Sequence, residues 1–134
     1  MLFRSNAQRH APGNVSFQHG DWFSALGTQR FDCIVANPPY IAAGDAHLAQ
    51  GDLRFEPADA LASGRDGLDA IRLIVVQAPP YLQAGGWLAL EHGYDQAAQC
   101  RQLLEEAGYT QVFSQRDLAG IERVSGGCLD AQKR

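Results

Sequence analysis

The sequence predicts an α/β fold, in which helices connect the strands of one sheet. Three observations predict it. The apolar, β-branched run Phe31–Ala36 ends abruptly at Asn37 and two prolines, as a strand buried on both faces would. Two amphipathic stretches of helical spacing follow, and a second apolar strand, Trp87–Glu91, lies between them. Strands that alternate with helices of about 10 to 15 residues indicate a sheet wound by crossovers, with ligands at the carboxyl ends of its strands.

One further strand is predicted before Phe31. Residues 4–10 are polar and compatible with a helix, which the Ala-Pro-Gly-Asn sequence at 11–14 ends. Val15–His19 alternates apolar and polar side chains, as a short strand does, and Gly20 and Asp21 end it. Polar residues thus follow two predicted strands, at Asp21-Trp22 and at Asn37–Tyr40, so the fold and the candidate site agree.

The predicted helices follow an irregular segment, 41–67, which is rich in Gly, Asp and Ala. A stretch of this length without regular structure usually carries function or covers another part of the domain. Asp66 is expected to cap the first helix, which Pro79-Pro80 ends. The apolar stripe of the first helix is Leu68, Ile71, Val75 and Ala78. The stripe of the second helix is Ala97, Cys100, Leu104 and Ala107, with Gly108 as its stop.

The remaining strands complete the predicted sheet. Gly85-Gly86 forms a turn that leads into the strand Trp87–Glu91. After the second helix, strand-like runs near Tyr109–Gln115 and Ile121–Leu129 are joined by a short polar turn. We expect these two runs to form an antiparallel pair at the C-terminal end of the fold.

The length and composition predict a single domain, and the cysteine pattern and the lack of a targeting segment predict a cytoplasmic location. The 134 residues, 46% of them hydrophobic, suffice for one core. The 11 basic and 15 acidic side chains give a net charge of −4, and the scattered arginines weigh against direct nucleic-acid binding, which needs a basic face. Cys33, Cys100 and Cys128 stand far apart, which predicts reduced core thiols and no metal site. No transmembrane run or signal peptide is found, so we expect a soluble cytoplasmic protein.

The Asn-Pro-Pro-Tyr sequence at 37–40 carries the candidate chemistry. Methylation of an amide nitrogen requires that its NH2 group be held in line with a methyl donor, and two acceptors, one for each N–H, can hold it. The Asn37 side-chain oxygen and the Pro38 carbonyl are suitable acceptors. Two consecutive prolines stiffen the corner because proline lacks an N–H, fixes its own φ and keeps the preceding residue extended. Tyr40 offers a flat face for a planar amide.

The alternative interpretation is that Asn37-Pro38 only begins a turn. The chain supplies a comparison, because Pro79-Pro80-Tyr81 has the same Pro-Pro-Tyr sequence, lacks the Asn and follows a helix. We interpret that second sequence as structural. Asn37–Tyr40 stands at the end of a strand, and we interpret it as functional.

Several motifs in a fixed order resemble one family. They are Gly20-Asp21-Trp22-Phe23, the run FDCIVANPPYI at 31–41, Arg54-Phe55-Glu56-Pro57, Leu90-Glu91-His92-Gly93 and Glu122-Arg123-Val124. Over essentially its whole length the chain resembles the peptide chain release factor N5-glutamine methyltransferases, the HemK/PrmC family. The tetrapeptide alone is shared with DNA adenine methyltransferases, and its combination with the RFEP and LEHG motifs is much more specific.

The resemblance implies a class I, Rossmann-like methyltransferase fold with S-adenosyl-L-methionine as the cofactor. It implies methylation of the glutamine in the GGQ motif of peptide chain release factors, and hence a role in translation termination. Asn37 and Pro38 would bind the glutamine amide, Pro39 would stiffen the loop, and Tyr40 would pack on the amide.

The resemblance also implies cofactor contacts. Asp21 and Trp22 would lie beside the adenine, and Asn37 would border the methyl end of the cofactor. The alternative interpretations are that Asp21 is only a turn residue and that Trp22 is only a core residue. Arg54 and Glu56 would either shape the substrate loop or form an internal salt bridge. The Glu91-His92 pair is expected to be structural.

The expected departure from the family is large. We expect residues 1–134 to form a truncated catalytic domain, without the N-terminal helical domain, the first two strands and the Gly-rich cofactor loop. Neither Gly85-Gly86 nor Gly126-Gly127 opens a helix, as a GxGxxG loop must. In the family's strand order, 3-2-1-4-5-7-6, the strand at Val15 would pair with the second strand and the strand at Ile34 with the first, and both partners would be missing. Two unpaired edges and an exposed apolar face follow, which indicates a fragment.

Two other functions stay open. One is a nucleic-acid adenine-N6 methyltransferase, which predicts a basic groove near Asn37, where the chain has Asp45, Asp52 and Glu56. The other is a non-catalytic remnant that folds or associates and does not hold the cofactor.

Overall fold

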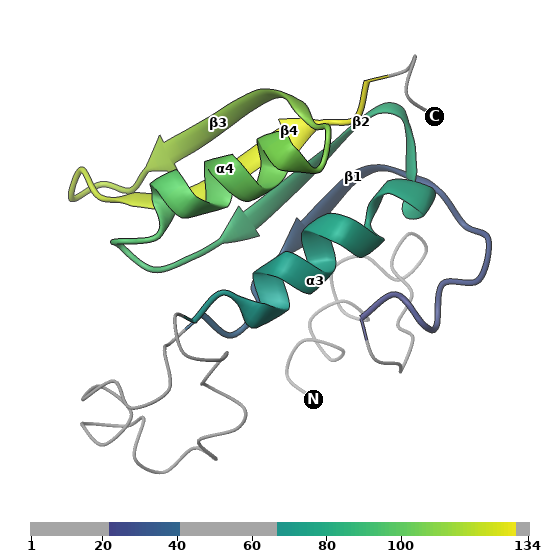
Figure 1. Ribbon diagram of the computed structural model, residues 1–134, viewed down its shortest axis with the longest axis horizontal. Coiled ribbons are helices and arrows are strands. Elements are labelled where there is room, and N and C mark those ends of the chain that lie inside the picture. The colour runs from purple at the N-terminus through teal and green to yellow at the C-terminus, as the bar shows by residue number, and fades with distance from the viewer. Residues whose placement is uncertain (1–21, 41–66, 131–134) are drawn as a thin grey trace, which may run out of the picture.

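The computed structural model describes residues 22–40 and 67–130. This part of the chain forms a four-stranded sheet and two α-helices, α3 and α4 (Figure 1). The elements in chain order are β1 (Phe31–Ala36), α3 (Asp69–Gln77), the 3-10 turn η3 (Pro79–Tyr81), β2 (Leu82–Glu91), α4 (Ala97–Glu106), β3 (Thr110–Arg116) and β4 (Glu122–Cys128).

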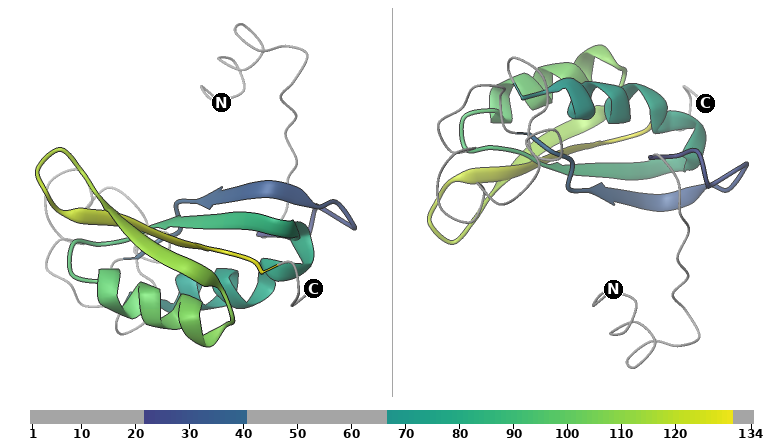
Figure 2. Two further views of the ribbon diagram at one scale, coloured as in Figure 1. Left: turned by 90° about the horizontal axis from the view of Figure 1, so that it is seen from above. Right: turned by 90° about the horizontal axis from the view of Figure 1, so that it is seen from below.

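The sheet has the strand order β1-β2-β4-β3. β1 and β2 are parallel, with α3 in the connection between them, and β4 runs antiparallel to both β2 and β3. The predicted C-terminal antiparallel pair is therefore confirmed. Both helices cover the same face of the sheet (Figure 2). This order corresponds to the 4-5-7-6 part of the expected methyltransferase sheet, so the fold class is confirmed.

The core lies between the two helices and the sheet. Its central side chains are fully or almost fully buried: Ile71, Ile74 and Val75 of α3, Leu88 and Leu90 of β2, and Cys100 and Leu104 of α4. Each buried Leu or Ile contributes about 1.5–3 kcal/mol relative to an exposed one. Burial also raises the pKa of the Cys100 thiol to about 12. The apolar stripe predicted for α3 is confirmed, since Leu68 and Ala78 are buried as well.

β1 differs from the prediction of a strand buried on both faces. Ile34 and Ala36 pack against the core, whereas Val35 is 77% exposed on the opposite face. Within residues 22–40 and 67–130, β1 pairs with β2 alone, and neither helix covers its outer face. The same exposure applies to Cys33, which was expected to be a core thiol. Among the described residues, β1 thus has one free edge and an exposed apolar side chain on its outer face.

Three local boundaries also differ. α3 begins at Asp69 with Leu68 at its N-cap and no side-chain cap hydrogen bond, and Asp66 lies outside the described residues. Ala107 is exposed because it occupies the C-cap of α4, beyond its last turn. β2 begins at Leu82, and Gly85-Gly86 is a bulge within this strand, held by hydrogen bonds of 2.8 and 2.7 Å to the Leu129 backbone. In the described part of the chain, no helix has the length and apolar character that crossing a membrane requires.

Candidate functional site

A hollow of about 340 Å³ lies at the carboxyl end of β1. Its walls are mainly apolar and include Phe23, Leu26, Ile34 and Ile74. Trp22 and Asn37 line the same hollow, although they are 15 positions apart in the sequence. The tertiary structure therefore brings together two of the three predicted cofactor-binding residues. The third, Asp21, lies outside the described residues.

Trp22 is not a core residue. Its side chain is 41% exposed, and its backbone adopts a positive φ of 54°, which is uncommon for a bulky residue. The neighbouring Phe23 is buried and stacks on Tyr81, with ring centroids 4.9 Å apart. Phe23 thus anchors this turn, and the Trp22 ring remains at the surface of the hollow. The alternative interpretation of Trp22 as a core tryptophan is wrong.

A second hollow, of about 500 Å³, shares Trp22 and Phe23 with the first. It extends along α3 to Leu73 and Gln77. Tyr81 lines it from η3, and the stacking of Tyr81 on Phe23 agrees with the structural interpretation of the second Pro-Pro-Tyr sequence.

The diproline corner combines an exposed residue with a buried one. Asn37 is exposed at the rim of the hollow, whereas Pro38 is fully buried directly after it. Pro39 and Tyr40 are partly buried. Because Pro38 is enclosed by the fold and its φ is fixed by the ring, Asn37 is attached to a rigid support.

Tyr40 is fixed at two points. Its hydroxyl donates to Glu91 Oε1 at 3.3 Å, and its backbone carbonyl accepts from Gln96 Nε2 at 2.9 Å. Burial raises the pKa of the Tyr40 hydroxyl, and the nearby Glu91 carboxylate raises it further, while Arg123 acts in the opposite direction. The hydroxyl is therefore protonated at neutral pH and available as a donor.

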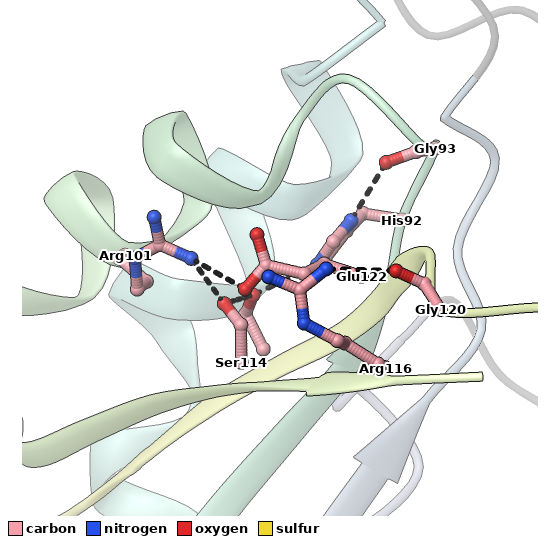
Figure 3. A network of polar contacts seen from close by, with 8 residues as sticks. His92, Gly93, Arg101, Ser114, Arg116, Gly120 and Glu122 are labelled. Atoms are coloured by element: carbon pink, nitrogen blue, oxygen red, sulfur yellow. Dashed lines mark hydrogen bonds and ion pairs between the residues drawn. The ribbon is translucent and has the colours of Figure 1, made fainter.

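The turn after β2 holds these partners of Tyr40. Gln96 Oε1 accepts from the Gly93 N–H at 2.7 Å. His92 is fully buried, with Nδ1 2.9 Å from the Gly93 carbonyl oxygen and Nε2 2.8 Å from Ser125 Oγ (Figure 3). His92 thus joins the turn to β4, as its structural interpretation expects.

Sequence reasoning missed Gln96 and understated Glu91. Gln96 is three residues beyond Gly93, just before α4, where a glutamine carries no distinctive signal. Glu91 was interpreted as structural, but it contacts the candidate site through Tyr40. Arg54 and Glu56 lie outside the described residues.

A parallel β1–β2 pair extended by an antiparallel hairpin, with an Asn-Pro-Pro-Tyr corner where β1 ends, defines part of a class I methyltransferase fold. No family model matches the chain. The sequence is nevertheless 55% identical over 122 residues to a release factor glutamine methyltransferase of Xylella fastidiosa, covering 91% of this chain and 44% of that protein. The protein of that name from Pseudomonas aeruginosa is 54% identical over 126 residues, covering 94% and 46%. That from Bordetella pertussis is 57% identical over 125 residues, covering 92% and 46%.

The resemblance predicted from the motifs is therefore confirmed: this chain is similar to release factor glutamine methyltransferases over about nine-tenths of its length. It spans less than half the length of these curated relatives. Among solved structures, a release-factor-specific protein-(glutamine-N5) methyltransferase from Alicyclobacillus acidocaldarius is 27% identical, with a TM-score of 0.49, covering 75% of this chain and 50% of that one.

Proposed function

We propose that this chain forms the substrate-holding part of an enzyme that methylates N5 of the glutamine in the GGQ motif of peptide chain release factors. The observation that carries the proposal is the exposed Asn37 on a buried Pro38, beside an apolar hollow at the end of β1. The names of the relatives support the same reaction and the same protein substrate. A cytoplasmic location, expected from the sequence, is part of the proposal.

The hollow fits one end of S-adenosyl-L-methionine. Its apolar walls and the half-exposed Trp22 ring suit a flat adenine, and Asn37 adds a polar group at the rim. When bound, the cofactor would supply an electrophilic methyl group on a sulfonium. Asp21, by the family resemblance, would accept a hydrogen bond from the adenine.

Asn37 and Pro38 would orient the substrate. An amide nitrogen is a poor nucleophile because its lone pair is delocalised into the carbonyl group. If the Asn37 Oδ1 and the Pro38 carbonyl each accept one N–H, the NH2 group is fixed in direction and its lone pair becomes more localised as the reaction proceeds. Tyr40 would support the amide plane with its ring. Glu91 accepts from the hydroxyl of that ring, and Gln96 donates to the Tyr40 backbone carbonyl. No ionised base is required before methyl transfer.

The test uses this chain in two forms. One is the 134-residue chain alone, and the other is a chimera in which the chain replaces the matching part of the Pseudomonas aeruginosa relative, to which it is 54% identical. Transfer of labelled methyl groups to a release factor carrying GGQ, and to one with the glutamine replaced by alanine, would be measured. The chimera is expected to methylate the release factor that carries GGQ and not the one in which alanine replaces the glutamine.

Asn37→Ala in the chimera is expected to lower kcat by about 10²–10³-fold, because one of two acceptors is lost. The Kd for S-adenosylmethionine should change by less than about threefold, which separates orientation from cofactor binding. Gln115→Ala, an exposed change on β3, is the control. Near-normal turnover of Asn37→Ala would remove Asn37 from the mechanism. Methylation of adenine in an oligonucleotide would favour the nucleic-acid alternative, and a chimera without cofactor affinity would favour the non-catalytic remnant.

A further inference from the structure

Gln96 joins two segments that are 56 positions apart in the sequence. Its Nε2 donates to the Tyr40 carbonyl at 2.9 Å, and its Oε1 accepts from the Gly93 N–H at 2.7 Å. The residue is only 6% exposed. One buried amide therefore holds the end of the Asn37–Tyr40 segment and the turn after β2 at the same time.

This use of the side chain is not helix capping. Gln96 occupies the N-cap position of α4, but its side chain makes no cap hydrogen bond. Both ends of the amide point to groups outside the helix instead, and each end has the polarity that its partner requires, since a carbonyl only accepts and an N–H only donates. A glutamine satisfies both partners at once, whereas a glutamate, with acceptors alone, does not.

The Gly93 side of this bridge is itself fixed. The His92 Nδ1 bonds to the Gly93 carbonyl, and His92 Nε2 bonds to Ser125 Oγ in the interior of the sheet (Figure 3). The described residues include no buried side-chain polar atom without a hydrogen-bond partner. Gln96 therefore connects Tyr40 to a well-supported turn. Through Gln96, the turn and His92, the Tyr40 backbone is linked to Ser125 of β4.

We propose that Gln96 is a positioning residue for methyl transfer: it fixes the backbone at Tyr40 and thereby the relative placement of the Asn37 and Pro38 oxygens. The inference rests on the proposed function of the Asn37–Tyr40 corner. The hydrogen bonds of Gln96 to Tyr40 and Gly93 do not involve the Asn37 or Pro38 oxygens directly, so it acts through the backbone of a stiff four-residue segment. A displacement of about 1 Å in reacting groups can cost about 10²-fold in rate, so loss of this bridge should be measurable.

The experiment compares Gln96→Glu with Gln99→Glu in the chimera with the Pseudomonas aeruginosa relative. Gln96→Glu keeps the acceptor for Gly93 and loses the donor to Tyr40, whereas Gln99 lies exposed on the same helix and receives the same change. Gln96→Glu is expected to lower kcat by about 10²-fold, while the KM for S-adenosylmethionine stays within about twofold. Gln99→Glu should leave both unchanged. Gln96→Met, which cannot ionise, provides a second variant if Gln96→Glu fails to fold.

A second measurement does not depend on activity. Burial raises the pKa of the Tyr40 hydroxyl, and the nearby Glu91 carboxylate raises it further. NMR of tyrosines labelled at the ring carbon that bears the hydroxyl, with Tyr40→Phe for assignment, follows this titration in the 134-residue chain. If Gln96 holds the segment, the Tyr40 titration in Gln96→Met, which adds no charge beside the hydroxyl, moves toward the ordinary value.

The outcomes separate the two proposals. An unchanged Tyr40 titration, or a kcat within about twofold of that of the unmodified chimera, overturns the role of Gln96. A shifted titration in the 134-residue chain, combined with a chimera that never methylates release factors, overturns the proposed function and leaves Gln96 as the support of the segment. A shifted titration together with the loss of kcat supports both.

Discussion

His92 and Ser125 meet inside the fold, with His92 Nε2 2.8 Å from Ser125 Oγ, although 33 positions separate them in the sequence. Because His92 Nδ1 faces a carbonyl oxygen, it carries the proton, and in the neutral imidazole Nε2 accepts from the Ser125 hydroxyl. Ser125 Oγ then accepts from Ser114 at 2.6 Å, and Ser114 accepts from Arg101 Nη1 at 2.6 Å. With these donors, the hydrogen bonds run in one direction from the Arg101 guanidinium to the Gly93 carbonyl (both residues are labelled in Figure 3).

Ser125→Ala tests this network. The change leaves Nε2 of the buried His92 without its partner, and an unsatisfied buried polar group costs about 1–3 kcal/mol. The free energy of unfolding, measured by urea denaturation, should fall by that amount. Thr28→Ala, in an exposed turn, is the control and should change it by less than about 0.5 kcal/mol. Equal stability of the two variants would contradict the network.

Gly126→Ala tests the close packing of β4. A Cβ at Gly126 would collide with the Leu88 carbonyl oxygen and lie 2.9 Å from the Phe113 ring. β4 is paired on both sides, so its backbone has little freedom to shift, and a loss of about 3 kcal/mol is expected in thermal unfolding.

The matched change is Gly120→Ala in the β3–β4 turn. A Cβ at Gly120 meets nothing within 4 Å, but φ is +81°, so a loss of about 1 kcal/mol is expected from the backbone alone. Should Gly120→Ala prove the more damaging of the two, the packing around Gly126 would not be as described.

The ionised Asp117 side chain in the β3–β4 turn makes the stability of the fold depend on pH in the acid range. Its carboxylate accepts from the Ile121 N–H at 3.0 Å, the Ala119 N–H at 2.9 Å and Arg123 Nε at 3.4 Å. The Ile121 hydrogen bond is the main cause of a lowered Asp117 pKa, and the bonds from Ala119 and Arg123 add to it. A lowered folded-state pKa stabilises the fold above the unfolded-state value, and this stability is lost as pH falls through the folded-state value.

Asp117→Asn should therefore lower the Tm at neutral pH, and the difference from the unmodified chain should shrink as the pH falls below about 4. Thermal scans at several pH values measure it. Leu118→Ala, fully exposed at the same turn, should leave the pH dependence as it is. A Tm difference that is the same at all pH values would show that the charge of Asp117 is not involved.

Tyr109→Phe tests a buried hydroxyl in the core. Tyr109 is 4% exposed, and its hydroxyl donates to the Val75 carbonyl at 3.0 Å. Loss of this bond should cost about 1 kcal/mol. Burial raises the Tyr109 pKa well above its ordinary value, so the fold favours the neutral hydroxyl.

The stability of the unmodified chain and that of Tyr109→Phe should therefore depend differently on pH in the alkaline range. The stability that comes from the neutral Tyr109 hydroxyl is fully present below pH 10 and is lost as pH rises through the higher folded-state pKa. The unmodified chain should thus lose stability faster than Tyr109→Phe in denaturation series above pH 10. Parallel curves for the two chains would contradict the buried titration.

The extent of prediction differs between elements. The stripe of α3, the stripe of α4 apart from the exposed Ala107, and the β3–β4 pair were predicted correctly, because local periodicity and turn residues specify them. The burial of β1 on both faces, predicted from its apolar run, was wrong because Val35 is exposed, whereas the family's strand order had indicated an exposed apolar face. At the candidate site, the resemblance and the diproline corner predicted Asn37–Tyr40, whereas the contact of Gln96 with Tyr40 was missed because its hydrogen bond joins it to a carbonyl 56 positions away.

The sequence by itself determined the stiff corner at 37–40, since the φ of each proline and the extended residue before it are fixed by covalent geometry. It also determined which faces of the two helices are apolar. Only the tertiary structure decided that Trp22 and Asn37 line the same hollow and that Glu91 and Gln96 hold Tyr40. Such contacts depend on the register of β1 against β2 and on the packing of the turn after β2, which are properties of the assembled sheet and of no single segment.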